Sequence, residues 1–450
     1  MAEIPFEQLL VALESTRGTP EDTPTLYLNM AGTLTPVKAR YRPDESRGTL
    51  AEYYRSVDAR RWSEFEATGG LDVYTLPLLL NVLVAGGIDG SGATAATLTT
   101  SLTGDNNDVV WTAVTAGNTG NTIAIQYIDP EANSSALNVD VDGRVVKVYL
   151  ATDATGEITS TADDIKTAVA AHPVASTLVS GTDADLNDGS GVVTAMDVTY
   201  LSGGAGAEVT TPEGATNSRL WTFTPTMTAD DLEAMTIWFG DPNVQIFRAG
   251  FGMIDELSIE ADASGDEGVT LSINGQALFP TKVADPTPPD MLEAPLLQPG
   301  KMQLWMDETT IGTTAVTGRV VSASISVPSG ITRKWLAAGP TSDLSFTSIG
   351  RGKRHAELTL VLEVPDTTQY DLYVDGTVLK TRVRLNGSLI ETGFYFYVDF
   401  DIYGPIESAS WGENQGSNRT LELTILSEND ATAGYDWCFR IQNDRDALTG

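Results

Sequence analysis

Apolar and polar side chains alternate along much of the chain. Serines separate the apolar residues of the segment 321–327, and Leu358, Leu360 and Leu362 alternate with other side chains in the same way. A period of two residues is typical of a strand that buries one face. The pattern predicts a mainly β protein.

A helical period is limited to three short segments. Thr161 and two acids open one that runs to 171, a similar Thr-Ala-Asp-Asp motif at 228–231 opens one that runs to 239, and the apolar run 76–84 is the third. A threonine followed by acids is typical of a helix start, where negative charge favours the helix dipole. We therefore expect few and short helices.

One order of elements occurs twice. A short strand (26–28; 302–305) precedes a strand (32–40; 318–326), a long polar loop (43–70; 328–353), a further strand, a helical or turn segment, and a closing hairpin (247–273; 396–425). Self-similarity of this kind indicates duplicated domains.

A shift in composition interrupts the first copy. Between residues 93 and 205 the chain carries 14 acidic and 3 basic residues, and Gly-rich joints lie at 86–92 and 203–206. This composition and the two joints predict that the segment is an inserted domain, with strands around Ile125, Val139, Val148 and Tyr200. The expected boundaries are 1–92 with 206–283 for the first domain, 93–205 for the insert, 284–299 for a Pro-rich linker, 300–430 for the second domain and 431–450 for a C-terminal tail.

The order of strand, long loop, strand, short helix and hairpin resembles the major tail tube proteins of long-tailed bacteriophages. The likeness covers 320–428, and again 34–83 joined to 220–278, while GNTGNTI at 117–123 and LSGG at 201–204 resemble an accessory module of phage tail proteins. The resemblance implies tandem tail-tube domains that form β-sandwiches or a barrel, each with a short helix, and a small β-rich insert that is Ig-like or α+β.

The resemblance also implies a function. The protein would be a structural subunit of the virion tail, assembled in the host cytoplasm, whose rings stack into a hollow tube that conducts viral DNA without binding it specifically. Two domains per chain imply trimeric, pseudo-sixfold rings, and a true hexamer lined only by the second domain is the alternative. Its partners would be other copies, the tape measure, the tail terminator and the baseplate or distal tail proteins.

Charge adds a second argument. The chain of 450 residues has 27 Lys and Arg against 61 Asp and Glu, a formal net charge of -34. Such a balance repels nucleic-acid phosphates and anionic lipids, which suits a lumen that DNA slides through, although solubility alone explains it equally well. The apolar run 76–84 is about half of the roughly 20 residues that cross a bilayer, and 1–7 lacks an export signal, so membrane insertion is not expected.

Basic residues nevertheless gather in and beside the two long loops. We predict that they form arms reaching neighbouring subunits or rings, against the alternative of solvated loop charges. The predicted inter-subunit residues are Arg42, Arg47, Arg55, Arg60, Arg61, Arg333, Lys334, Arg351, Lys353 and Arg354.

Catalytic chemistry is not predicted. His172 and His355 stand apart from each other and from Cys438, the single cysteine, and the acidic stretch 183–189 departs from a calcium loop in the place of its glycine. We expect no enzyme activity, cofactor or metal. The second functional hypothesis is a phage adhesin or decoration protein that binds a host surface through the insert.

Overall fold

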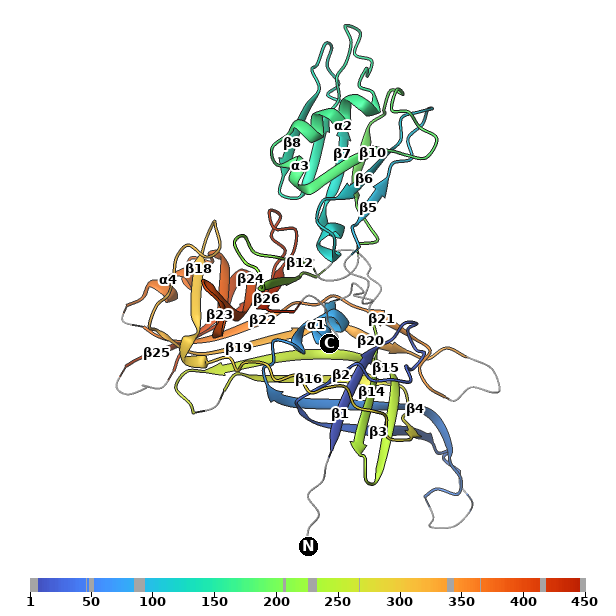
Figure 1. The fold of residues 1–450 in the computed structure, drawn as a ribbon, viewed down its shortest axis with the longest axis vertical. Coiled ribbons are helices and arrows are strands. Elements are labelled where there is room, and N and C mark those ends of the chain that lie inside the picture. The colour runs from blue at the N-terminus through green and yellow to red at the C-terminus, as the bar shows by residue number, and fades with distance from the viewer. Residues whose placement is uncertain are drawn as a thin grey trace.

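The computed structural model describes residues 7–45, 47, 52–84, 94–204, 208–225, 233–266, 268–337, 344–364, 366–412 and 418–445. It shows a β-rich body of two units, with the inserted domain standing away from it (Figure 1). The expected mainly β class is confirmed.

Each unit contributes four antiparallel strands to one long sheet. The first unit supplies β3 (Ala31–Tyr41), β4 (Val57–Gly70), β16 (Thr270–Ala277) and β15 (Gln245–Asp262), paired in that order. The second supplies β19 (Val320–Pro328), β22 (Glu357–Glu363), β25 (Thr420–Leu426) and β24 (Phe394–Trp411), also paired in that order. β15 pairs with β19, so the two sets are continuous. The shared connectivity supports a duplication, which remains an inference.

A second layer covers one face of the long sheet. In the first unit it contains β1 (Gln8–Leu13), β2 (Leu26–Tyr27), β14 (Met235–Asp241), the start of β15 and β17 (Thr281–Val283). In the second it contains β18 (Gln303–Asp307), β23 (Val378–Glu391), the start of β24, β26 (Trp437–Asn443), β13 (Arg219–Phe223) and β12 (Glu208–Thr210). β15 and β24 therefore belong to both layers, and each has a bulge where it passes between them.

One hydrophobic core fills the space between the layers of both units. Leu257, Ile325 and Leu423 enter it from the long sheet, and Trp437 and Phe439 enter it from the second layer. The short helix expected at 76–84 is α1 (Leu76–Val84), which lies inside this core with every residue buried, Asn81 included. The second unit has α4 (Thr368–Val374) at the corresponding place in the chain.

The inserted domain has its own core and is α+β. One sheet is β11 (Met196–Tyr200), β7 (Ala124–Ile128), β9 (Val145–Tyr149) and β8 (Asn138–Asp142), and the other is β10 (Val179–Asp183), β6 (Val109–Ala113) and β5 (Thr97–Thr99). Helices α2 (Ala162–Ala171) and α3 (Ala175–Leu178) and the 3-10 turn η1 (Asn118–Thr122) complete it. The Trp111 indole N–H donates to the Tyr127 hydroxyl at 2.8 Å inside its core. The predicted capping box of α2 is present at Thr161.

Four sequence predictions are wrong, the last of which concerns the second long loop. The segment 235–239, expected to end a helix, belongs to strand β14, because Met235 and Ile237 alternate into the core; residues 228–232 of that expected helix lie outside the described residues. The expected loop 43–70 contains β4. The expected tail 431–450 contains β26, whose Phe439 packs in the core.

The second long loop also contains structure. Strands β20 (Ile331–Lys334) and β21 (Ser348–Arg351) pair within the expected loop 328–353, and we call this hairpin the flap. The linker is irregular from 284 to 298 and ends in the 3-10 turn η2 (Pro299–Lys301).

Because α1 is enclosed by the core, Leu79→Ala should lower the free energy of unfolding of the body by about 2–5 kcal/mol. Urea unfolding followed by tryptophan fluorescence measures the change. Leu336→Ala removes the same atoms at a site that is 64% exposed, so it should cost less than about 0.5 kcal/mol. Equal losses for the two variants would contradict the enclosed position of α1.

Candidate functional site

The face of the long sheet that points away from the core is made of hydroxyls and carboxylates. Ser258 pairs with Ser326 and Ser272 with Thr68, while the alternate positions point into the core. The carboxylates of this face are Glu64, Glu66, Glu256, Glu260, Asp262, Glu357, Glu363 and Glu422. Among the described residues, Lys and Arg occur on this side only at the margins: Arg60 follows Trp62 on the same side of β4, Arg319 lies opposite Glu363, and Arg333 is 3.7 Å from Glu64. We call this surface the polar face.

Hydrogen bonds tie the polar face together across strands. The Ser326 hydroxyl donates to a Glu256 carboxylate oxygen at 2.5 Å, and the Thr68 and Ser272 hydroxyls lie 3.1 Å apart. Glu66, Glu260 and Glu422 are exposed. The face therefore presents negative charge and neutral hydroxyls to whatever lies in front of it.

The long sheet has two open edges. Among the described residues β3 pairs only with β4, and the segment 406–411 of β24 pairs only with β25. Trp411, at the second edge, is 39% exposed. An open edge presents unpaired N–H and C=O groups, which another strand can satisfy.

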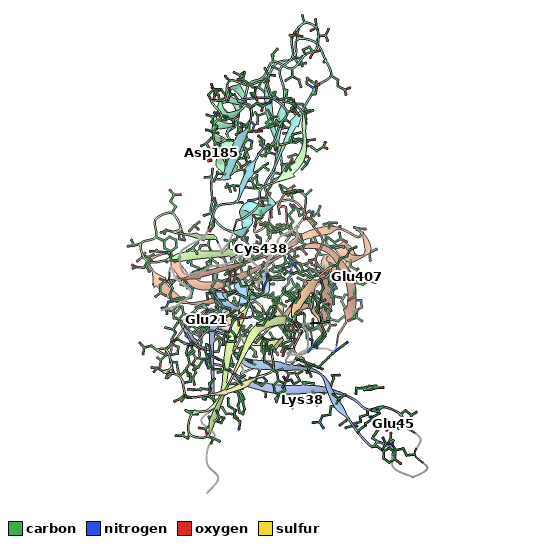
Figure 2. All side chains as sticks on the ribbon, turned by 90° about the vertical axis from the view of Figure 1, so that its right-hand side faces the viewer. Glu21, Lys38, Glu45, Asp185, Glu407 and Cys438 are labelled. Carbon is green, nitrogen blue, oxygen red and sulfur yellow. The ribbon has the colours of Figure 1, made fainter. Side chains whose placement is uncertain are left out.

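Beyond the core, β3 and β4 continue as an arm that projects from the body, along which Figure 2 labels Lys38 and Glu45. The predicted residues Arg42, Arg47 and Arg55 lie near its end. The Arg42 guanidinium is 5.2 Å from the Tyr53 ring centroid, and Arg47 and Arg55 both form ion pairs with Glu45. Arg47 and Arg55 remain 51% and 70% exposed.

Other predicted arm residues make contacts within the chain. Arg60 stacks at 4.7 Å on Trp335 of the flap segment, and Arg333 stacks at 4.7 Å on Trp62 and lies 3.7 Å from Glu64 at the rim of the polar face. The flap comes from the second unit, while Arg60 and Trp62 belong to β4 of the first. These contacts hold the two units together.

Of the remaining predicted residues, Arg61 and Arg351 also make contacts within the chain. The backbone N–H of Arg61 donates to the Leu344 carbonyl at 2.9 Å, and the Arg351 guanidinium donates to the carbonyls of Ser329 and Leu83 at 3.0 and 3.1 Å. Lys334 ends β20, and Lys353 and Arg354 lie between β21 and β22.

A buried ion network on the outer side of the second layer has no counterpart in the sequence predictions. Arg382 faces Asp401 across the β23–β24 hairpin, with bonds of 2.6 and 2.8 Å, and Arg384 faces Asp399 with two bonds of 2.6 Å. Arg440 of β26 also pairs with Asp401. Burial raises the pKa of Asp399 even though Arg384 opposes the shift. The sequence signal that could have revealed this network is the presence of opposite charges at positions that face each other in a hairpin.

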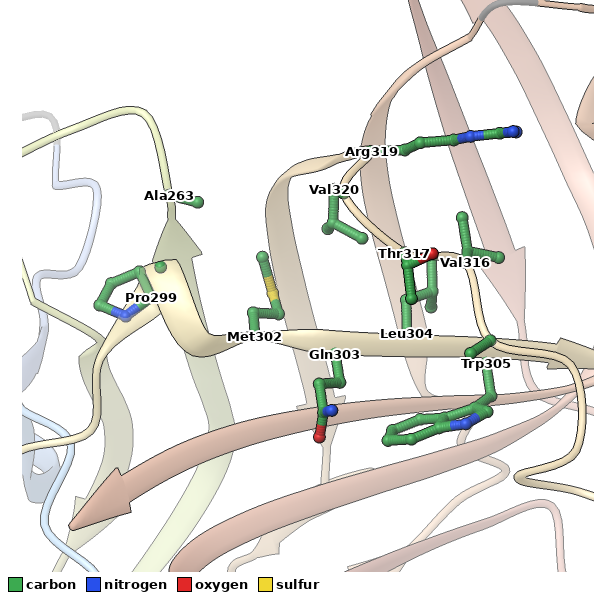
Figure 3. A pocket seen from close by; sticks show the side chains of 13 residues that line it. Ala263, Pro299, Met302, Gln303, Leu304, Trp305, Val316, Thr317, Arg319 and Val320 are labelled. Carbon is green, nitrogen blue, oxygen red and sulfur yellow. The ribbon is translucent and has the colours of Figure 1, made fainter.

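A small pocket lies where the two units meet. Its volume is about 200 Å³, and Ala263, Met302, Trp305, Val316 and Val320 are among the residues that line it (Figure 3). Most of this lining is apolar, and Arg319 is at its margin. The pocket brings together no set of groups suited to acid-base or nucleophilic chemistry.

The part of the chain that the structure describes contains neither a metal-binding cluster nor a membrane-spanning helix. No group of three or more His, Cys, Asp or Glu side chains is arranged to hold a metal ion. No helix there has the length and apolar character needed to cross a bilayer.

No protein-family model matches the chain, and no curated protein matches it as a relative.

Proposed function

We propose that the protein is a structural subunit of a phage tail tube, located in the virion tail after assembly in the host cytoplasm. Its rings stack into a hollow tube that conducts viral DNA to the host. The observation that carries the proposal is the long sheet, which combines a repeated four-strand unit, two open edges and a face of hydroxyls and carboxylates with bases only at its margins.

Ring formation follows from the open edges. A sheet with one covered face and two free ends gains hydrogen bonds when identical copies extend it, and a closed ring leaves no edge exposed. Because each chain carries two similar units, three chains supply six, which favours a trimeric ring with pseudo-sixfold symmetry. A true hexamer, lined by the second unit alone, is the competing arrangement.

The polar face suits the wall of a DNA channel. Duplex DNA carries one charge per about 1.7 Å, so basic side chains along a wall would hold it at many points. Carboxylates such as Glu66 and Glu260 repel phosphates, and hydroxyls such as those of Ser258 and Ser324 are neutral. DNA would then pass without specific binding.

The arms and the insert have separate roles in this proposal. Arg47 and Arg55 are exposed at the end of the arm, which suits contact with acidic surfaces of the next ring. The tape measure, the tail terminator and the baseplate or distal tail proteins would occupy the inside and the ends of the tube. The insert, which stands away from the body, would decorate the outside (Figure 1).

The projecting insert also favours the second candidate function, a phage adhesin or decoration protein that binds a host surface. The insert has a separate core around Trp111, which suits a domain that binds a surface apart from the body. In that case the body would be a scaffold, and the open edges of the long sheet would not need to pair with those of other copies.

Electron microscopy of the purified protein tests the proposal. Hollow tubes or rings are the expected result, because closure satisfies the open edges. Native mass measurement of single rings should give three chains. Discrete monomers or fibres, at concentrations up to the solubility limit, would refute the tube and favour the adhesin.

Reversing charge on the polar face should make the lumen bind DNA. We expect rings of the variant Glu66→Lys, Glu260→Lys, Glu422→Lys to bind a short fluorescent duplex, with anisotropy that falls steeply between 50 and 200 mM salt. Wild-type rings should not bind. The control Glu131→Lys, Glu157→Lys, Asp185→Lys makes the same change of charge on the insert, and equal binding by this control would refute the lumen assignment.

Reversing charge on the arm should affect stacking alone. We expect Arg47→Glu with Arg55→Glu to give single rings or much shorter tubes in electron micrographs, because the end of the arm would then carry negative charge and be repelled by the acidic surface of the next ring. The matched control is Lys282→Glu with Lys301→Glu, two exposed lysines outside the arm. Tubes of unchanged length in the arm variant would contradict the proposed contact.

A further inference from the structure

We propose that each copy of the chain joins the next by pairing the end of β24 with β3, in the register that β15 and β19 adopt inside the chain. The partner is a second copy of this chain. The inference rests on the proposed function and specifies the contact by which the ring would close.

The first landmark is the bulge in each long strand. Pairing with the neighbouring strand skips one residue between Ile254 and Glu256 in β15, and one residue between Ile406 and Ser408 in β24. Ile254 and Ile406 thus occupy equivalent places. Three residues past the skipped position of each strand, Ser258 corresponds to Ser410.

The second landmark is a row of directly paired residues across each unit, starting at the residue before the bulge. In the first unit the row is Ile254, Gly275, Phe65 and Leu34; in the second it is Ile406, Ile425, Leu358 and Ile325. Leu34 therefore corresponds to Ile325. Thr35, the next residue, corresponds to Ser326.

The joint inside the chain then supplies the register. Ser258 lies opposite Ser326, and Ile259 lies opposite Ile325. Transferring these pairs to the open edges places Ser410 opposite Thr35 of the next copy, and Trp411 opposite its Leu34.

The exposure of the side chains at the open edge agrees with the register transferred from the internal joint. At the internal joint Ile259 and Ile325 are 1% and 2% exposed, whereas Trp411 at the open edge is 39% exposed. Trp411 is held in place by Tyr370, with ring centroids 5.5 Å apart, and by the Arg419 guanidinium 4.8 Å from its ring. A fixed, exposed tryptophan at a core-facing position of an open edge is suited to burial against an apolar partner.

The polar face would also continue across the contact. Ser410 and Thr35 lie on that face, as Ser258 and Ser326 do at the internal joint. Pro36 of β3 would lie opposite Ala409, and since proline lacks an N–H, the new ladder has at most one hydrogen bond fewer there. The same register brings hydroxyl beside hydroxyl and apolar beside apolar.

Cysteine pairing tests the register. In the full chain, Thr35→Cys with Ser410→Cys should form disulfides between copies under mild oxidation, because directly opposed strand positions have Cα atoms about 4.5–5.5 Å apart. We expect covalent oligomers to hold most of the protein on non-reducing gels. Cys438 is buried with 0% exposure, so it should not contribute.

Matched variants calibrate this result. Ser258→Cys with Ser326→Cys tests the same register inside the chain, and should give an intrachain bond in a protein that stays monomeric on the gel. Thr33→Cys with Ser410→Cys shifts the pair by two residues, to roughly 7–8 Å, which a disulfide does not span. Each single-cysteine variant measures how much disulfide forms by random collision between copies.

The outcomes separate the register from the function. Rings with efficient Thr35–Ser410 coupling, at least tenfold above the shifted pair, support the proposal. Rings or tubes that couple only through the shifted pair, or through neither pair, overturn the register and leave the tube function standing. Monomers without rings and without coupling overturn both.

Discussion

The antiparallel pairing of β15 with β19 is the interaction on which the rest of the structure depends. It runs from Glu256 opposite Pro328 to Asp262 opposite Ser322, and it converts two sheets of four strands into one. Its core-facing residues, among them Leu257 and Val327, are completely buried. One hydrophobic core spans both units as a result, and the polar face is continuous from β3 to β24.

The flap reinforces this joint from the rim. Because β19 lies beside β15, the loop that follows β19 leaves the second unit next to the first and folds onto β4, where Trp335 meets Trp62 with ring centroids 5.9 Å apart. Phe346 of the flap segment is buried against Phe251 of β15, with ring centroids 5.2 Å apart. The first long loop has no adjacent unit within the chain, so its strands extend into solvent as the arm. Loops at equivalent places thus differ because only one of them has a neighbour.

Most of the fold follows from local sequence pattern, and the failures have physical causes. Helix α1 was predictable because nine apolar-rich residues without alternation can be buried on every side, and β19 and β22 were predictable from strict alternation. β14 was missed because Met235 and Phe239 also fit a helical spacing, and β4 was missed because the small residues Ser63 and Ala67 alternate inward with little hydrophobic contrast. Which loop charges meet which aromatic rings depends on strand order, so no sequence pattern separates Arg333, which contacts the first unit, from Arg55, which is exposed.

The distribution of charge along β3 and β4 bears on why the bases lie at the margin of the polar face. Solubility requires a large net charge and sets no requirement on where each sign lies. On these two strands, however, the polar-face positions are Thr33, Thr35, Glu64 and Glu66, and the bases Lys38, Arg40, Arg60 and Arg61 begin where the strands leave the face for the arm. The β-propensities of lysine and glutamate are similar enough that strand formation does not account for this separation. Under the proposed tube function, this change from carboxylates to mostly basic side chains, among which Asp58 pairs with Lys38 and Arg40, suits a wall that repels phosphates and an arm that meets an acidic neighbour.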